Sequence, residues 1–162
     1  MLLLETLQLI IVGDGAVSIL ILFLAIGLLP IFVREFRISL RLLLAYWFVI
    51  ALHQAVAFGN AFIFLTPGAV SDAVRFHNIA VLIARSENFT SSFAAAAGCF
   101  NFYCNLLGVL YWVAHPSKLL GSQMSILAFG ISCIILIKIL SLLELSRYKV
   151  PVLLAFGALP SM

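Results

Sequence analysis

Four long stretches of the chain contain no charged residue, and they restrict its fold more than any other feature. They cover residues 15–33, 42–65, 93–114 and 119–137. A helix needs about 20 apolar residues to cross a membrane, because the hydrocarbon core is about 30 Å thick and each residue adds about 1.5 Å. We therefore expect an all-α, polytopic transmembrane protein in which these four stretches are the spans.

The composition supports the same fold class. The chain has 162 residues, of which 65% are hydrophobic and 9% charged. Soluble domains carry about a quarter charged residues, so this chain could not cover a water-facing surface. We expect residues 1–162 to form a single transmembrane domain surrounded by membrane lipids.

Basic residues gather at the ends of the apolar stretches. The first cluster contains Arg34, Arg37 and Arg41 against Glu35, and the positive-inside rule places it in the cytoplasm. The second cluster contains Lys138, Glu144, Arg147 and Lys149. This distribution is typical of cytoplasmic loops and interfacial anchors, and it argues against a nucleic-acid partner.

The two basic clusters create a conflict of topology. Three predicted spans separate them and would put them on opposite sides of the membrane, whereas the positive-inside rule favours one side for both. Either residues 93–114 do not fully cross the membrane, or the second cluster is external. The sequence leaves both alternatives open.

Other segments are not expected to cross. Thr66-Pro67-Gly68 ends the second span, and residues 71–85 predict a short amphipathic helix in the outer interface, with Leu82 and Ile83 on its apolar side. Residues 150–162 are too short for a full crossing and give a partial fifth span. They stop in mid-pattern, from which we expect the chain to be the front part of a longer protein.

Two of the spans contain breakers or polar groups. Pro30 predicts a kink near the end of the first span. His53, Gln54 and Asn60 make the second span more polar than a lipid-facing helix, so we expect this face to meet other helices. His53 fits a proton relay or, more simply, a hydrogen bond to a neighbouring helix. The three cysteines lie in or beside apolar segments without metal-ligand spacing, as small buried hydrophobes do.

The segment SDAVRFHNIA at residues 71–80 carries a family resemblance. It resembles the first external loop of type-C membrane glycosyltransferases and related surface-polysaccharide enzymes, which often show Asp-Ala-x-x-Tyr/Phe-His-x-x-Ala. LGVLY at residues 107–111 and LPS at residues 159–161 are also similar. The resemblance covers residues 42–162, with residues 15–33 as an additional leading helix.

This resemblance implies the N-terminal portion of a glycosyltransferase or polysaccharide polymerase in the inner membrane, inactive without its missing helices. Asp72 would then be a catalytic or metal-binding carboxylate, and His77 would assist proton transfer. Arg75 and Arg85 would bind the phosphate of a polyprenyl-phosphate sugar donor. This chemistry implies no certain cofactor, although the carboxylate can hold a divalent cation against the phosphate. Phe76 departs from the Tyr that such enzymes often have.

Plainer roles also fit these residues. Asp72 can cap the helix and pair with Arg75, Arg75 and Arg85 can anchor to lipid headgroups, and His77 can simply be solvated. The main alternative function is a small, non-enzymatic membrane subunit that packs against a larger transporter or assembly. A complete small transporter is disfavoured, because the predicted spans contain no acidic residue.

Overall fold

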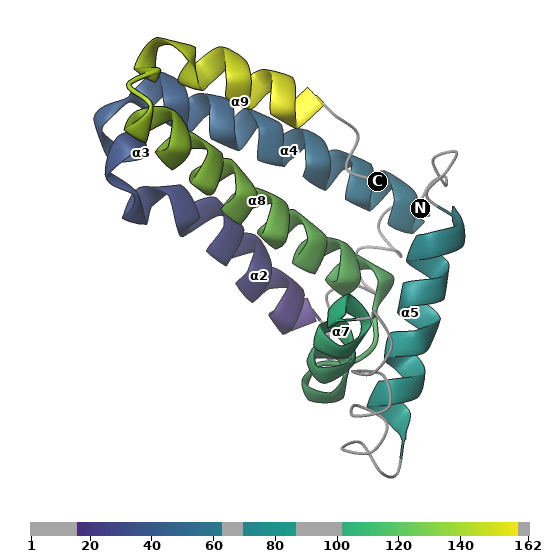
Figure 1. The fold of residues 1–162 in the computed structure, drawn as a ribbon. Helices are drawn as coiled ribbons and strands as arrows, with labels where there is room; N and C mark the ends of the chain where they lie inside the picture. The colour runs from purple at the N-terminus through teal and green to yellow at the C-terminus, as the bar shows by residue number, and fades with distance from the viewer. Residues whose placement is uncertain (1–15, 63–69, 87–101, 159–162) are drawn as a thin grey trace, which may run out of the picture. The chain divides into compact units, whose positions relative to one another are not determined.

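The computed structural model describes residues 16–62, 70–86 and 102–158, and all regular structure within them is helical (Figure 1). The all-α prediction is confirmed for these residues. The α-helices are α2 (Ala16–Leu28), α3 (Arg34–Ile38), α4 (Leu40–Phe62), α5 (Val70–Arg85), α7 (Phe102–Val113), α8 (Lys118–Leu142) and α9 (Lys149–Ala158). Two 3-10 turns are also present, η1 (Leu29–Phe32) and η2 (Ser146–Tyr148).

Two helices, α4 and α8, are long and apolar enough to cross a membrane. They contain 23 and 25 residues, which correspond to about 35 and 37 Å at 1.5 Å per residue. The prediction ended the fourth span before Lys138, but α8 continues to Leu142. The helix continues because Lys138 is exposed, and a charge on a helix surface does not interrupt the backbone hydrogen bonds beneath it.

The other apolar helices are shorter. Residues 16–32, which combine α2 and η1, form an apolar helical stretch, and α7 has 12 residues, or about 18 Å. Helix α7 covers the second half of the third predicted span, while residues 93–101 lie outside the described part of the chain. Helix α3 was not predicted, because its sequence, REFRI, has too many charges for an apolar helix.

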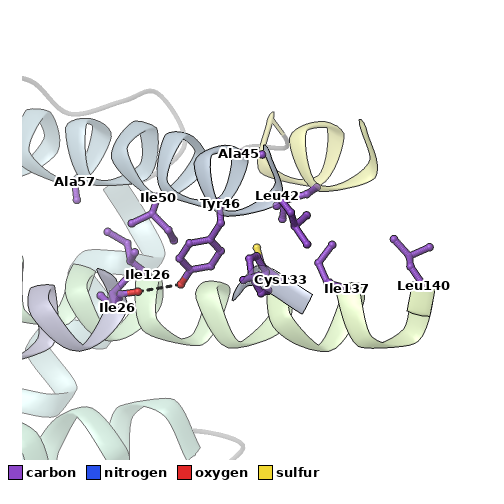
Figure 2. Close-up of a cluster of buried hydrophobic side chains, with 12 residues drawn as sticks. Ile26, Leu42, Ala45, Tyr46, Ile50, Ala57, Ile126, Cys133, Ile137 and Leu140 are labelled. Carbon is purple, nitrogen blue, oxygen red and sulfur yellow. Dashed lines mark hydrogen bonds between the residues drawn. The ribbon is translucent and has the colours of Figure 1, made fainter. Parts of the chain in front are cut away.

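The chain divides into two compact units. The first comprises Met1–Leu20 and Gly59–Ser122, and the second comprises Ile21–Phe58 and Gln123–Met162. In the second unit a hydrophobic cluster forms where α4 and α8 meet, and Figure 2 shows its side chains. Its largest fully buried members are Tyr46, Phe36 and Ile26. Burying large apolar side chains such as these stabilises the unit.

Pro30 follows the end of α2, where backbone carbonyl groups accept hydrogen bonds from side chains of α4. Because proline has no N–H, the carbonyl of Ile26, four residues earlier, loses its ordinary helical donor. The Tyr46 hydroxyl donates to this oxygen at 3.1 Å (Figure 2). The neighbouring Trp47 Nε1–H donates to the carbonyl of Gly27 at 3.0 Å. The kink predicted from Pro30 is therefore a 3-10 turn whose orphaned carbonyls are bonded by α4.

Helix α9 lies alongside α4 in the second unit (Figure 1). Gly157 packs so closely on Val49 that a methyl group at position 157 would overlap both Val49 methyls. The ring of Phe156 stacks on that of Phe129 of α8, and the ring centroids lie 5.4 Å apart. The predicted partial span thus begins as a ten-residue helix packed on both long helices.

In the first unit, α5 packs against α7. Gly108 of α7 allows the close approach, since a Cβ there would lie 2.8 Å from Ile83 Cγ2. Ala80 and Ile83 are the buried apolar residues of α5 at this contact. The sequence placed Leu82 on the same apolar side, but Leu82 is 72% exposed. The helix turns about 100° per residue and carries Leu82 away from α7. The place of Leu82 on the apolar side of an interfacial helix stays a prediction.

Candidate functional site on α5 and α7

The predicted site residues lie on α5, whose bounds agree closely with the predicted amphipathic helix at residues 71–85. This helix places His77, Ala80 and Ile83 toward α7. These positions are three residues apart, which is the spacing of one helix face. His77 is therefore a polar side chain on the face of α5 that packs against α7.

His77 is held by a hydrogen-bonded pair with Tyr111 of α7. The distance between His77 Nδ1 and the Tyr111 hydroxyl oxygen is 2.9 Å. The same hydroxyl donates to the backbone carbonyl of Ser117 at 2.8 Å. Because a tyrosine hydroxyl has one hydrogen, His77 Nδ1–H is the donor when both bonds form. This arrangement leaves the lone pair on His77 Nε2, where it can accept a proton.

The surroundings of His77 also favour the neutral imidazole. Burial lowers the pKa of His77 from its ordinary value of 6.5, and the positive charge of Lys118, at the start of α8, lowers this pKa further. Both effects disfavour the charged ring. The interpretation of His77 as a merely solvated residue is wrong, since its ring is partly buried and bonded to Tyr111.

The two predicted phosphate-binding arginines are not brought together. Arg75 and Arg85 are both exposed on α5, and ten residues of helix separate them by about 15 Å along the axis. A single phosphate group therefore contacts one of them at a time. Exposure suits either a donor phosphate or a lipid headgroup, so both predicted roles remain.

Asp72 belongs to the first turn of α5, and its side chain lies outside what the structure describes. Its predicted roles as catalytic carboxylate, metal ligand or helix cap remain predictions. Within the described ranges, no group of three or more His, Cys, Asp or Glu residues is arranged to hold a metal ion. Glu87, the nearest other acid in the sequence, lies outside these ranges.

Polar groups in the two long helices are bonded to one another. The amides of Gln54 in α4 and Gln123 in α8 exchange two hydrogen bonds, of 2.8 and 2.7 Å. Both side chains are buried, with Gln54 6% and Gln123 0% exposed. The expectation that this polar face meets another helix is confirmed for Gln54. His53 lies against the ring of Phe129, with centroids 4.2 Å apart.

Sequence reasoning did not identify Tyr111 and Ser117 as partners of His77. Tyr111 entered only as part of the LGVLY resemblance, and 34 residues separate it from His77. The one sequence signal is Gly108, three residues before Tyr111, because a small residue on an apolar helix marks a close helix contact.

Comparison of the chain with protein-family models, with curated proteins and with solved structures gives no match.

Proposed function

We propose that this chain is a multi-pass inner-membrane protein that takes part in sugar transfer from a lipid-linked donor. The reaction would occur beside α5, with His77 as the general base. The observation that carries this proposal is the hydrogen bond from His77 Nδ1 to Tyr111, which places the lone pair of the neutral ring on Nε2, the atom that accepts a proton. The similarity of residues 71–80 to external loops of membrane glycosyltransferases supports the same assignment.

In the proposed transfer step, each predicted site residue has a distinct role. His77 Nε2 takes the proton from an acceptor hydroxyl, and the acceptor oxygen bonds to the anomeric carbon of the donor sugar. The bond from that carbon to the phosphate oxygen breaks, and the phosphate leaves with the electron pair. Arg75 or Arg85 offsets its charge, while Asp72 orients the acceptor or a divalent cation.

The first test measures sugar transfer in native membranes that contain the protein, using a radiolabelled polyprenyl-diphosphate sugar. Loss of a general base lowers rates by about 10² to 10⁴-fold, so we expect His77→Gln to reduce transfer to that extent. We expect Asp72→Asn to reduce it similarly. Asn78→Ala is the matched control, because Asn78 is exposed on the same helix next to His77.

The pH profile separates a proton-transfer role from a structural one. Transfer should decline at low pH as Nε2 becomes protonated, with a midpoint below 6.5, because burial and Lys118 lower the pKa of His77. Lys118→Gln removes the nearby cation and should move this midpoint to higher pH. Unchanged transfer by His77→Gln, or a midpoint that ignores Lys118→Gln, would contradict the proposed role of His77.

We also infer which segments cross the membrane. Arg34 of the first basic cluster and Lys149 of the second line one cavity within the second unit, which supports a common cytoplasmic face for both clusters. An even number of crossings then separates them, and α4 and α8 supply two. On this proposal, residues 93–114 do not cross, which removes the topology conflict and leaves residues 16–32, α4 and α8 as spans.

A second candidate function is the non-enzymatic membrane subunit. It is favoured by the second unit, where Gln54 and Gln123 satisfy each other instead of presenting polar groups to a ligand. If this candidate is correct, the wild-type protein shows no donor-dependent transfer. Cross-linking in native membranes should then recover it at a constant ratio to one larger membrane protein.

A further inference from the structure

A second candidate site is a polar cavity where α4 begins and α8 ends. It has a volume of about 410 Å³ and lies wholly within the second unit. Its polar lining consists of Arg34, Glu35, Ser39, Ser141, Ser146 and Lys149. The lining comes from two stretches that are distant in sequence, residues 34–42 and 141–150, so the fold, and not one local motif, builds the cavity.

The cavity lies in the most basic part of the protein. Six of the nine Lys and Arg residues of the chain belong to the two clusters that meet here. Arg34 and Lys149 line the cavity itself, against the single acid Glu35. A guanidinium group forms two parallel hydrogen bonds to phosphate oxygens, and an ammonium group adds a mobile positive charge. The net charge therefore favours an anion.

Two helix N-termini add to this preference. Ser39 and Leu42 belong to the start of α4, where the Leu42 N–H donates to the Ser39 hydroxyl oxygen at 3.3 Å. Lys149 and Val150 are the first residues of α9. The Leu42 N–H is bonded to Ser39 and the Lys149 N–H to the Ser146 carbonyl. These two helix starts therefore contribute the partial positive charge of the helix dipole, which favours an anion.

Apolar side chains complete the cavity and indicate how its ligand is held. Ile38, Leu42 and Val150 line it beside the polar groups. Leu40 and Leu142 are neighbours in sequence of the lining residues Ser39 and Ser141 and are 67% and 83% exposed, and Ile38 is itself 73% exposed. A free phosphate ion would gain nothing from these side chains, whereas an acyl chain attached to the phosphate would cover them.

We propose that this cavity binds the phosphate of an anionic phospholipid, with Arg34 and Lys149 on the headgroup and the acyl chains along the exposed apolar residues. The site fixes the cytoplasmic ends of α4, α8 and α9 to the inner leaflet, where anionic headgroups attract basic segments. This inference does not rest on sugar transfer, and it holds for either function proposed above.

Native mass spectrometry of the purified protein with added phosphatidylglycerol tests the proposal. We expect the wild type to retain the lipid and the double variant Arg34→Gln/Lys149→Gln to bind it about tenfold more weakly or worse, because two charged hydrogen-bond donors are lost. The matched control is Arg37→Gln/Arg147→Gln. It removes the same charge from the same two clusters, but neither residue lines the cavity.

Two further ligands identify the source of the phosphate. Diacylglycerol has the acyl chains without the phosphate and should not be retained. Glycerol phosphate has the phosphate without the chains and should bind far more weakly than phosphatidylglycerol. Equal binding of glycerol phosphate and phosphatidylglycerol would overturn the lipid assignment, as would equal loss of lipid from the cavity variant and the control variant.

Two single substitutions test the sign of the charge and do not depend on the double variant folding. Glu35→Gln removes the repelling carboxylate and should increase phosphatidylglycerol retention, whereas a cation site would lose affinity. Ser146→Trp keeps every charge but fills the cavity from an exposed position, and it should decrease retention. A decrease in retention for Glu35→Gln, or no decrease for Ser146→Trp, would contradict the proposal.

Discussion

Single side chains in this protein donate hydrogen bonds to backbone carbonyls of another helix that lack a helical donor. Pro30 removes the hydrogen-bond donor of the Ile26 carbonyl, and two aromatic residues at the start of α4 bond the exposed carbonyls of α2. A buried carbonyl without a partner costs about 1–3 kcal/mol. Tyr46 is fully buried and Trp47 is partly exposed, so the Tyr46 bond is the one that solvent cannot replace.

The interaction between Tyr46 and Pro30 can be measured by a double-mutant cycle. Tyr46→Phe keeps the ring packed edge-on against Phe36 and removes only the hydroxyl, so we expect the free energy of unfolding to fall by about 1 kcal/mol. Pro30→Ala restores an N–H that can bond the Ile26 carbonyl. In that background, Tyr46→Phe should cost much less. Unfolding in detergent micelles measures each value, and an equal cost in both backgrounds would contradict the explanation.

At the scale of helices, glycines set how closely neighbouring elements approach. Gly157 places α9 directly on Val49 of α4, and a methyl group there has no room. Val49 is β-branched and has one strongly preferred rotamer in a helix, so it cannot turn away easily. The helix pair α5–α7 repeats this feature at Gly108 and Ile83.

We predict that Gly157→Ala displaces α9 and lowers the free energy of unfolding by about 1–3 kcal/mol, the usual cost of overpacking. Gly27→Ala is the matched control, because nothing lies within 4 Å of a Cβ at that helical position. The control should be neutral or stabilise by up to about 1 kcal/mol, since alanine favours helix over glycine. The proposal about α9 fails if Gly157→Ala is as stable as Gly27→Ala.

At the scale of the whole molecule, the proposed topology rests on the cavity that both Arg34 and Lys149 line. If both basic clusters face the cytoplasm, the segment between α4 and α8 begins and ends on the opposite side of the membrane. This segment contains α5 and α7. Helix α7 supports this arrangement, because its 12 residues span about 18 Å and cannot by themselves cross a core of about 30 Å.

Single-cysteine labelling tests this topology. In a background with Cys99, Cys104 and Cys133 replaced by alanine, we introduce Ile38→Cys or Ser146→Cys at exposed positions of the two clusters. A membrane-impermeant maleimide should label both in inverted vesicles and neither in right-side-out vesicles. Labelling of the two cysteines from opposite sides would mean that residues 93–114 cross the membrane after all.

Composition and charge spacing were sufficient to predict much of the secondary structure. The two long apolar helices and the amphipathic helix at residues 71–85 could be located from the sequence, because an apolar stretch of this length satisfies its backbone only as a helix. Three of the proposed site residues, His77, Arg75 and Arg85, could also be placed on one helix. Their roles in catalysis and binding remain predictions.

Tertiary structure decided which residues meet. The contacts of His77 with Tyr111, of Gln54 with Gln123 and of Tyr46 with Ile26 join residues 34, 69 and 20 positions apart. Helical periodicity gives the face on which a residue lies, but not the neighbour against which that face packs. For the same reason, the sequence could not predict that the two basic clusters lie together. Only the packing of α4, α8 and α9 brings Arg34 and Lys149 to one cavity.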